Sequence, residues 1–436
     1  MTAKILGGRF PERSVLEKEQ IQGLRRLLTL CEEHHLFYRE KFAQSGIDPS
    51  RLELPRDWSV LPFTTKEELL RAQQSVPPHG NLISQPFSSF TRLHQTSGTL
   101  GRPLRWFDTR ESWQALLEIW KDFFSMAGVD SADVIFFPFS FGPFLGFWSA
   151  FEAACQIGCL CLPGGGMSTL ARLRFLLDCR ATVVLCTPTY ALRMLEVAKA
   201  ECMDLTQSSV RAIIVAGEPG GSIASTRERI EKGWNARVFD HNGMTETGPL
   251  GMECRAQPGG IHLHEEHLWV EVLDPASNQP VPPGKVGELI ITTIHRQASP
   301  LIRYRTGDLV QVDKEACPCG SSFIRLQDGI RGRVDDMVFL RGNNLHPDTL
   351  QLILHRIQAV EEYQIEIDES NPLADLVVRI EIAGEASPEE TASVVEKEIR
   401  GELLFRPRVE VVPVGTLPRP EMKSRRIVKK MATKRC

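Results

Sequence analysis

Apolar runs of strand length recur along the middle of the chain, separated by segments of helix length. The runs begin at residues 134 (VIFFPF), 182 (TVVLCTP), 210 (VRAIIVAG) and 236 (ARVFDH). This alternation predicts a parallel sheet covered by helices, because strands buried on both faces appear as continuous apolar runs. Upstream, residues 15–46 have leucines at helical spacing. Residues 61–75 predict a further helix. Near its start, Thr64 and Thr65 each precede a glutamate by three positions, which is the capping-box spacing.

The pattern changes twice towards the C-terminus. From about 268 to 312 the apolar runs are shorter and bounded by turns, which predicts a smaller antiparallel or β-barrel-like subregion. After 333 we expect a compact βαββαβ unit, made of a short strand (336–341), a helix (346–358), strands (361–367, 375–383), a helix (388–403) and a strand (408–412). The basic end, 423–435, is interpreted as a solvated tail.

The expected fold is therefore of the α/β class. We expect a large N-terminal domain (1–332), with mixed or parallel sheets covered by helices and the small β-barrel-like subregion. A small α+β C-terminal domain (333–436) would follow.

Composition narrows the function classes. Of 436 residues, 42% are hydrophobic and 24% charged, as in a globular protein with more than one core. The formal net charge of −4 gives no reason to expect nucleic acid or an anionic membrane as a partner. No apolar run approaches the length of a membrane span, and the N-terminus lacks a signal peptide's apolar core. The 11 scattered cysteines indicate reduced thiols and a cytoplasmic location.

The segment HQTSGTLGRP (94–103) has the composition of an anion-binding loop. It combines three hydroxyl residues, two glycines and an arginine. Glycines let backbone N–H groups converge, hydroxyls add donors, and a cation balances phosphate charge. The Gly-Lys-Ser/Thr ending of the Walker pattern is missing. Taken alone, the segment is equally well explained as a surface turn.

Five further segments change that balance. In order they are AGEPGG (216–221), DHNGMTETG (240–248), YRTGD (304–308), GRVDD (332–336) and LPRPEMK (417–423). Together with the first loop they resemble the adenylate-forming (acyl-CoA synthetase) superfamily, and most closely its phenylacetate–CoA ligase branch. The resemblance implies an ATP-dependent carboxylic acid–CoA ligase. The acid would attack the α-phosphorus of ATP to give an acyl-adenylate and pyrophosphate, and coenzyme A would then displace AMP.

The resemblance also assigns roles to single residues. The catalytic set would be Glu246, which binds Mg²⁺, Thr245 at the α-phosphate, and Lys423, which brings positive charge to the reacting phosphorus. Asp335 matches the hinge about which the C-terminal domain swings. The nucleotide-binding set would be Ser97, Gly98, Thr99, Gly101, Arg102, Gly217, Glu218, Pro219, Asp240, His241, Asn242, Gly243, Met244, Asp308 and Arg333.

Three positions depart from the family pattern. Leu100 replaces a threonine, Asn242 an aromatic residue that stacks on adenine, and Met422 a glycine before Lys423. They leave open a non-catalytic nucleotide-binding homologue, although Glu246, Asp308, Arg333 and Lys423 are all retained. A second alternative is an acyl-adenylating enzyme that transfers to a separate carrier protein or an amine. The resemblance also implies a homodimer.

A second kind of chemistry is indicated by Cys317-Pro-Cys319-Gly320, a short turn with two soft ligands. Cys254 and the histidines of GGIHLHEEH (259–267) lie upstream. Three cysteines and one histidine suit a closed, tetrahedral, structural zinc site, and some members of the resembled branch carry zinc at such a cluster. We assign Cys254, His262, Cys317 and Cys319. Because His264 would share a strand face with His262, the choice of histidine stays open. Reduced thiols without a metal are the alternative.

The acid pocket implied by the resemblance falls in PFSFGPFLGFW (138–148). Phe139, Phe141, Gly142 and Phe144 would line it, because aromatic walls and the space left by glycine suit a flat or apolar acid. The alternative is that these phenylalanines fill the core. No cationic residue in this stretch indicates a second carboxylate on the substrate. Phenylacetate, a substituted benzoate and a medium aliphatic acid all fit.

Overall fold

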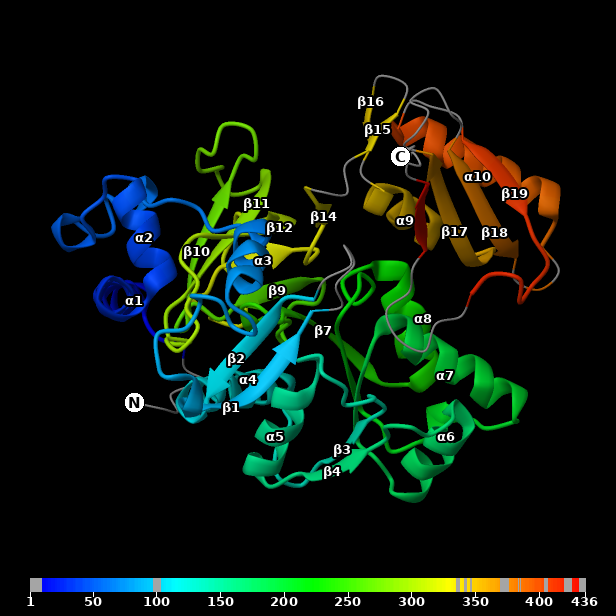
Figure 1. Ribbon diagram of the computed structural model, residues 1–436. Helices are drawn as coiled ribbons and strands as arrows, with labels where there is room; N and C mark the ends of the chain where they lie inside the picture. The colour runs from blue at the N-terminus through cyan, green and yellow to red at the C-terminus, as the bar shows by residue number, and fades with distance from the viewer. Residues whose placement is uncertain are drawn as a thin grey trace.

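The computed structural model describes residues 10–96, 103–334, 338–340, 343–345, 347–368, 376–382, 384, 386–403, 407–418 and 426–430 (Figure 1). The α-helices are α1 (Arg13–His34), α2 (Leu36–Gln44), α3 (Lys66–Ser75), α4 (Arg110–Ala127), α5 (Trp148–Ile157), α6 (Thr169–Asp178), α7 (Pro188–Ala200), α8 (Ala224–Trp234), α9 (Pro347–Arg356) and α10 (Pro388–Leu403). The strands are β1 (Phe90–Gln95), β2 (Arg105–Thr109), β3 (Val134–Phe137), β4 (Leu160–Pro163), β5 (Val183–Cys186), β6 (Ala212–Val215), β7 (Arg237–Met244), β8 (Gly248–Met252), β9 (Gly260–Leu263), β10 (Leu268–Leu273), β11 (Val286–Thr293), β12 (Tyr304–Gln311), β13 (Arg325–Gln327), β14 (Gly332–Arg333), β15 (Val338–Leu340), β16 (Asn343–Leu345), β17 (Val360–Asp368), β18 (Val377–Ile382), β19 (Arg408–Val411) and β20 (Ile427–Lys430).

The largest sheet has the order β13-β9-β8-β7-β6-β5-β3-β4. Strands β4, β3, β5, β6 and β7 run parallel, and β8, β9 and β13 continue the sheet in antiparallel pairs. Helices α4 and α5 contribute to the hydrophobic cluster on one face, and α6, α7 and α8 to the cluster on the other. In β5, Val183 and Leu185 point into the first cluster while Val184 and Cys186 point into the second. The apolar runs of the sequence thus correspond to strands buried on both faces.

Helix α4 shows how local sequence sets an element that borders the site. Its N-cap Thr109 accepts a hydrogen bond from the Ser112 backbone, and Gly128 ends it with φ 70°. A residue without a Cβ adopts this left-handed conformation at little cost. The expected capping box is also confirmed, since Thr65 and Glu68 cap α3 reciprocally.

A second sheet, β10-β11-β12-β14, is antiparallel throughout. It is the antiparallel subregion expected from the short runs after 268. Helices α1 and α2 pack beside it through a cluster that includes Leu24, Tyr38 and Ile302. An isolated β-bridge between Val312 and Leu326 connects it to the large sheet.

The C-terminal part is a four-stranded sheet, β19-β18-β17-β20, with α9 and α10 packed against it (Figure 1). Two expectations are corrected here. The strand expected at 336–341 pairs with β16 in a separate two-stranded ribbon instead of joining this sheet. Residues 427–430, interpreted as solvated tail, form β20 and pair in parallel with β17, because Ile427 can pack onto the small core.

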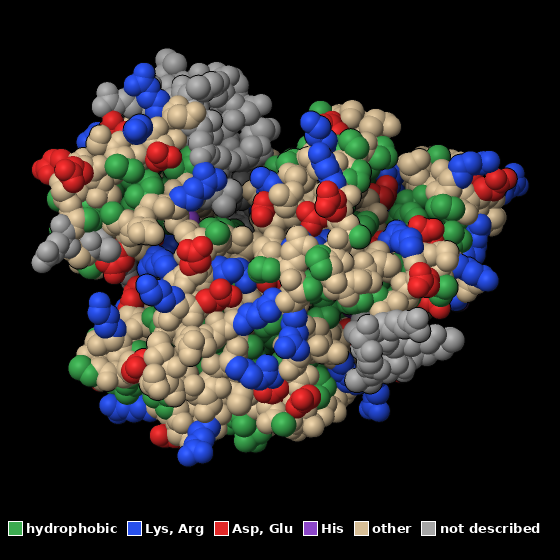
Figure 2. All heavy atoms as spheres, turned by 180° about the vertical axis from the view of Figure 1, so that it is seen from behind, with side chains coloured by type: hydrophobic (Ala, Val, Ile, Leu, Met, Phe, Trp, Pro, Cys, Tyr) green, Lys and Arg blue, Asp and Glu red, His purple; other side chains and the backbone are tan. Residues whose placement is uncertain are grey.

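The small part lies against α8 of the large part (Figure 1). Thr226 Oγ1 on α8 lies 2.6 Å from His355 Nδ1 on α9. Residues Gly332–Arg333 still pair with β12, next to the proposed division at 332/333. On the face shown in Figure 2, Lys and Arg side chains are interspersed with Asp and Glu, in line with the small net charge. Within the described ranges, none of the helices has the length and apolarity required to cross a membrane.

Candidate active site and metal centre

Glu246 lies in the turn between β7 and β8 and is only 4% exposed. Its Oε1 lies 3.1 Å from Nζ of Lys66, the first residue of α3, and accepts a 3.4 Å hydrogen bond from the Tyr304 hydroxyl on β12. Burial, followed by the charge of Glu246, raises the pKa of Tyr304 well above its usual value, so the hydroxyl stays protonated as a donor. Three separate elements therefore meet at this carboxylate.

Asp308 and Arg333 are direct cross-strand partners on β12 and β14. Arg333 Nη1 donates to Asp308 Oδ1 at 2.8 Å. Both charges act electrostatically on the Tyr304 hydroxyl, as Glu246 does. Glu246, Asp308 and Arg333, three of the residues singled out from separate motifs, thus all lie within electrostatic range of one buried tyrosine, and Glu246 contacts it directly.

Gly217, Glu218 and Pro219 follow β6, in the loop before α8. The Glu218 side chain accepts from the backbone N–H of Thr189 at 2.8 Å and from the Thr189 hydroxyl. Its carboxylate therefore lies at the N-terminus of α7, where negative charge is favoured. It also acts electrostatically on Arg426 and Tyr363 of the small part. Gly217 and Pro219 are exposed.

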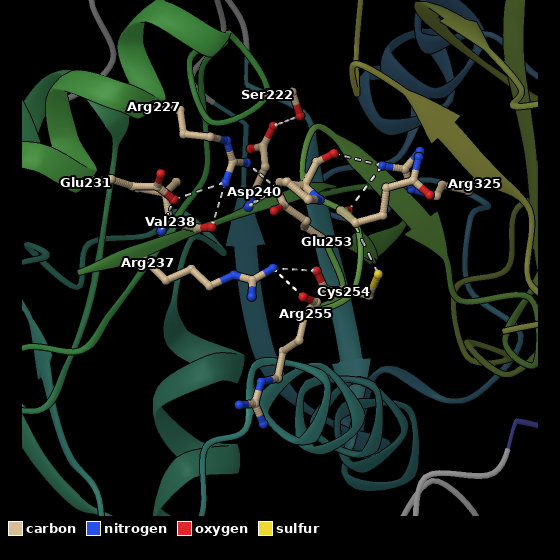
Figure 3. Close-up of polar contacts among 12 residues, drawn as sticks. Ser222, Arg227, Glu231, Arg237, Val238, Asp240, Glu253, Cys254, Arg255 and Arg325 are labelled. Carbon is tan, nitrogen blue, oxygen red and sulfur yellow. Dashed lines mark hydrogen bonds and ion pairs between the residues drawn. The ribbon is translucent and has the colours of Figure 1, made fainter. Parts of the chain in front are cut away.

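Asp240, in β7, faces a buried polar network (Figure 3). Ser222 Oγ donates to Asp240 Oδ2 at 2.5 Å, while Arg227 contacts Glu253 beside it and donates to the Val238 carbonyl at 2.8 Å (Figure 3). Burial raises the pKa of Asp240 to about 6. Its carboxylate belongs to this network, which joins β7 to Ser222 and to Arg227 of α8.

The next residues of β7 are placed differently. His241 turns to the opposite face, where its ring lies 4.4 Å from that of Trp120, and burial lowers its pKa to about 4. Among the described residues, neither amide atom of Asn242 has a hydrogen-bond partner. Gly243 is exposed and Met244 is half-buried. That these residues line an adenine pocket stays a prediction.

The aromatic residues expected at the acid pocket form one cluster. Phe141 packs edge-on against Phe139, Trp148 and Phe151, with centroid distances of 5.1, 4.8 and 5.2 Å. It has φ 47°, a conformation that costs a bulky residue energy and that persists at sites the surroundings constrain. Gly142 accepts a 2.9 Å hydrogen bond from Trp148 Nε1, and Phe144 is half-buried nearby. Whether they contact the acid stays a prediction.

Cys254, His262, Cys317 and Cys319 converge, with their ligand atoms all within 4.8 Å of one another. Cys254 Sγ lies 3.5 Å from Cys317 Sγ, and Cys319 Sγ lies 3.5 Å from His262 Nε2. Ligands of a tetrahedral zinc at about 2.3 Å would be about 3.7 Å apart. Burial opposes ionisation of Cys254, but hydrogen bonds from His262 and the backbone lower its pKa to about 6. The donor set and its spacing fit zinc.

Of the two histidines that the sequence left open, His262 is the one that lies with the three cysteines. Its Nδ1 lies 3.4 Å from the Phe323 carbonyl, so that Nε2 faces the sulfurs. A ligand histidine commonly uses its second nitrogen in this way. Strand β9 ends at Leu263, and His264 turns away to Asp122, with Nε2 2.9 Å from Oδ2.

Several expected site residues lie outside the described residues: Ser97, Gly98, Thr99, Leu100, Gly101, Arg102, Asp335, Met422 and Lys423. Two further groups contact the site that the sequence did not lead us to expect. Lys66, at the start of α3, contacts the Glu246 carboxylate. Arg296 donates to the backbone carbonyls of Thr245 and Glu246. A single basic residue far away in sequence carries no spacing signal, so only the fold reveals these contacts.

Comparison with known proteins defines the class. Residues 76–295 match the model of the AMP-binding enzyme family, and residues 342–430 that of the AMP-binding enzyme C-terminal domain. The phenylacetate-coenzyme A ligase of Thermus thermophilus is 30% identical over 86% of this chain and 84% of its own. The same-named ligase of Escherichia coli is 28% identical over 94% of each chain. The chain belongs to the AMP-binding enzyme family.

Solved structures agree with this assignment. A 2-hydroxyisobutyryl-CoA ligase in the postadenylation state, in complex with 2-HIB-AMP, has a TM-score of 0.91 at 26% identity and covers 97% of this chain and 91% of its own. In the thioesterification state the same ligase, with the same coverage at 27% identity, scores 0.74. The two parts of this chain are therefore arranged more as in the postadenylation form. The expected fold class is confirmed, and so is the activity class, an ATP-dependent, AMP-forming acid–CoA ligase that works through an acyl-adenylate.

Proposed function

We propose that this ligase activates an aryl or arylacetic acid, or another apolar acid, and joins it to coenzyme A. The aromatic cluster around Phe141 supports an apolar acid, since such rings bind flat or hydrophobic groups. Several curated relatives are phenylacetate-coenzyme A ligases, which favours an arylacetic acid. The 2-hydroxyisobutyryl-CoA ligase adds a small aliphatic acid to those that must be tried.

The observation that carries the proposed site is the buried carboxylate of Glu246 beside Lys66 and Tyr304, with the Asp308–Arg333 pair within electrostatic range of the same hydroxyl. We assign Asp308 to the ribose hydroxyls, because an ionised carboxylate accepts hydrogen bonds strongly. Arg333, 39% exposed at its side chain, would then reach a phosphate or the ribose. Thr245 and Lys423 would donate to the α-phosphate as charge develops there.

The carboxylate of Glu246 suits Mg²⁺, which proteins commonly hold through one or two carboxylates together with substrate phosphates. When bound with ATP, the ion would neutralise phosphate charge. Lys66 lies beside the same oxygen, so it would share or yield Oε1 as the nucleotide arrives. Glu246→Gln should therefore raise the Mg²⁺ concentration needed for half-maximal adenylation.

At the cysteine cluster we propose a structural zinc ion. Cys254, His262, Cys317 and Cys319 fill the four positions of a tetrahedral site, which leaves no open position for substrate. The ion would join the turn at Cys317–Cys319 to the end of the large sheet. It would act on stability and not on the reaction itself.

The decisive experiment is acid-dependent exchange of labelled pyrophosphate into ATP, with phenylacetate, benzoate, 2-hydroxyisobutyrate and a medium aliphatic acid. We expect exchange with an aromatic acid and a thioester when coenzyme A is added. Exchange without a thioester would favour transfer to a carrier protein or an amine. ATP binding without exchange for any acid would favour a non-catalytic homologue. Homodimerisation and a cytoplasmic location are further parts of the proposal, to be checked by sedimentation and by cell fractionation.

A further inference from the structure

A buried ion pair lies directly behind the proposed catalytic turn. Arg296, between β11 and β12, is 2% exposed, and Asp108 on β2 is fully buried. Arg296 Nε donates to Asp108 Oδ1 at 2.8 Å, and Nη2 donates to Oδ2. Ser112 Oγ donates to the same carboxylate at 3.0 Å, and the guanidinium lies 5.4 Å from the ring centroid of Trp106. The orientation of the guanidinium is thus fixed from several sides.

The remaining nitrogen of Arg296 points at the site. Nη1 donates to the carbonyl of Thr245 at 2.8 Å and to that of Glu246 at 2.9 Å. These carbonyls belong to the two residues of the β7–β8 turn that we assign to the reaction. A lysine could not reproduce this arrangement, because only a planar guanidinium presents several N–H groups in a rigid fork.

Stability alone does not account for such a pair. Removing two charges from water is costly, and replacing a buried ion pair by apolar residues of similar volume is often neutral or stabilising. What the pair does provide is a rigid donor to two consecutive carbonyls. That donor restricts the rotation of the peptide units that carry the Glu246 side chain.

We propose that Arg296, oriented by Asp108, is a positioning residue for adenylation: it fixes the Thr245–Glu246 backbone so that the Glu246 carboxylate meets the metal-bound phosphates. This inference rests on the proposed role of Glu246. A shift of a catalytic group by about 1 Å can cost about 100-fold in rate. The effect of losing the fork should therefore appear in the chemical step and in the Mg²⁺ requirement.

The chain supplies a matched control in Arg303. It is 3% exposed, pairs with Glu271 at 2.9 and 3.0 Å, and donates from Nη1 to two carbonyls, those of Ser59 and Leu61, at 2.6 Å each. Its guanidinium also lies over an aromatic ring, that of Phe63, at 4.1 Å. The fork is the same, but it holds a segment before α3 instead of the catalytic turn.

The test compares Arg296→Met, Arg296→Lys, Asp108→Asn and Arg303→Met below their unfolding temperatures. We expect Arg296→Met to lower kcat/KM for pyrophosphate exchange about 100-fold. It should also raise the half-saturating Mg²⁺ concentration and speed amide hydrogen exchange in residues 243–249. Arg296→Lys and Asp108→Asn should show the same changes to a smaller degree. Arg303→Met should lower thermal stability and leave the Mg²⁺ dependence and the exchange of this turn unchanged.

These measurements distinguish a failure of the proposed function from a failure of the positioning role of Arg296. If the wild-type protein shows no acid-dependent exchange, the proposed function fails, while faster amide exchange at 243–249 in Arg296→Met still tests the fork. If the wild type is active and Arg296→Lys keeps its Mg²⁺ dependence and amide exchange, the positioning role is wrong. Equal changes in Arg303→Met would also overturn it. Should Arg296→Met fail to fold, Arg296→Lys and Asp108→Asn decide the question.

Discussion

The interior of the large part and its boundary with the small C-terminal part hold their polar groups in different ways. In the large part, buried arginines bind carboxylates and backbone carbonyls of several elements at once, as Arg296 and Arg303 do. At the boundary with the small part, one contact among the described residues is a chain of neutral groups. Thr226 Oγ1 lies 2.6 Å from His355 Nδ1, and His355 Nε2 lies 2.6 Å from the Tyr363 hydroxyl.

Two charges near this boundary, Glu218 and Arg426, each have a partner in their own part, although they also act electrostatically on one another. Glu218 accepts from the backbone of Thr189 at 2.8 Å, and Arg426 pairs with Glu362 at 2.5 and 3.0 Å. If the two parts separated, Glu218 and Arg426 would therefore each keep a partner. Removal of Arg296, in contrast, would leave the buried charge of Asp108 uncompensated, which is costly. We therefore expect a preformed site in the large part and a small part that changes position during the reaction.

The largest effect is expected from the residue that the small part would deliver. Lys423→Ala should lower adenylation about 100- to 1000-fold, because it removes a charged donor at the developing phosphorus charge. Thioester formation from supplied acyl-adenylate should stay close to wild type. Rapid-quench assays of each half-reaction measure both, with Lys397→Ala, an exposed lysine on α10, as the charge-matched control. Equal losses in both half-reactions would contradict the division of labour between the parts.

The next largest effect is expected at the cysteine cluster, which lies in the large part. Cys317→Ala should remove the zinc and cost about 3 kcal/mol or more in unfolding free energy, a loss typical of a structural metal. Cys186→Ala, at a buried thiol of the large sheet, should cost about 1 kcal/mol and keep the metal. Metal analysis and denaturant titration provide the two readouts. Wild-type protein purified without any zinc would refute the site.

The sequence predicted the elements whose own residues determine them. Runs such as VIFFPF and TVVLCTP became β3 and β5, and the helix expected at 388–403 has those bounds. β20 was missed because Ile427 and Val428 are two adjacent apolar residues flanked by basic ones, too short a run to predict a strand, and pairing with β17 makes them one. Tertiary context decided this segment against its composition.

In the candidate site, too, some residues could be predicted from the sequence, whereas their contacts could not. Cys317 and Cys319 could be assigned from their spacing, but the choice between His262 and His264 depends on where β9 ends. Glu246 and Asp308 could be assigned because each lies in a motif. Their contacts with Lys66, Tyr304 and Arg333 join segments far apart in the chain, so they required the fold. Motifs predicted the chemistry, and the fold supplied the neighbours of each residue.

The buried network of Figure 3 should make stability depend on pH. Burial raises the pKa of Asp240 from 3.8 to about 6, so between these values the folded protein holds a proton that the unfolded chain has lost. Stability from this group is therefore lost as pH rises from 3.8 to 6. Asp240→Asn should stabilise the protein at pH 8 by up to about 3 kcal/mol and by much less at pH 4.5. Denaturant unfolding at both pH values measures this.

Asp48→Asn is the control for this experiment. Asp48 is exposed, and the hydroxyl of Ser50 lowers its pKa, so its removal should act in the opposite direction. A loss of stability in Asp240→Asn that is larger at pH 8 than at pH 4.5 would show that the folded carboxylate is stabilised, and not penalised, in its charged form.

The smallest effect is expected at the boundary between the two parts. Thr226→Val keeps the shape of the side chain but removes its hydrogen bond to His355, worth about 1 kcal/mol, or about fivefold in the equilibrium between orientations. The arrangement closer to the postadenylation form should become less populated, as measured by energy transfer between dyes on the two parts. Thr391→Val, at a buried threonine of α10, removes a hydroxyl within the small part and should leave the equilibrium unchanged. If Thr226→Val alters overall unfolding and leaves the orientation as it was, the neutral contact is part of a rigid interface, and the contrast between a fixed large part and a movable small part is wrong.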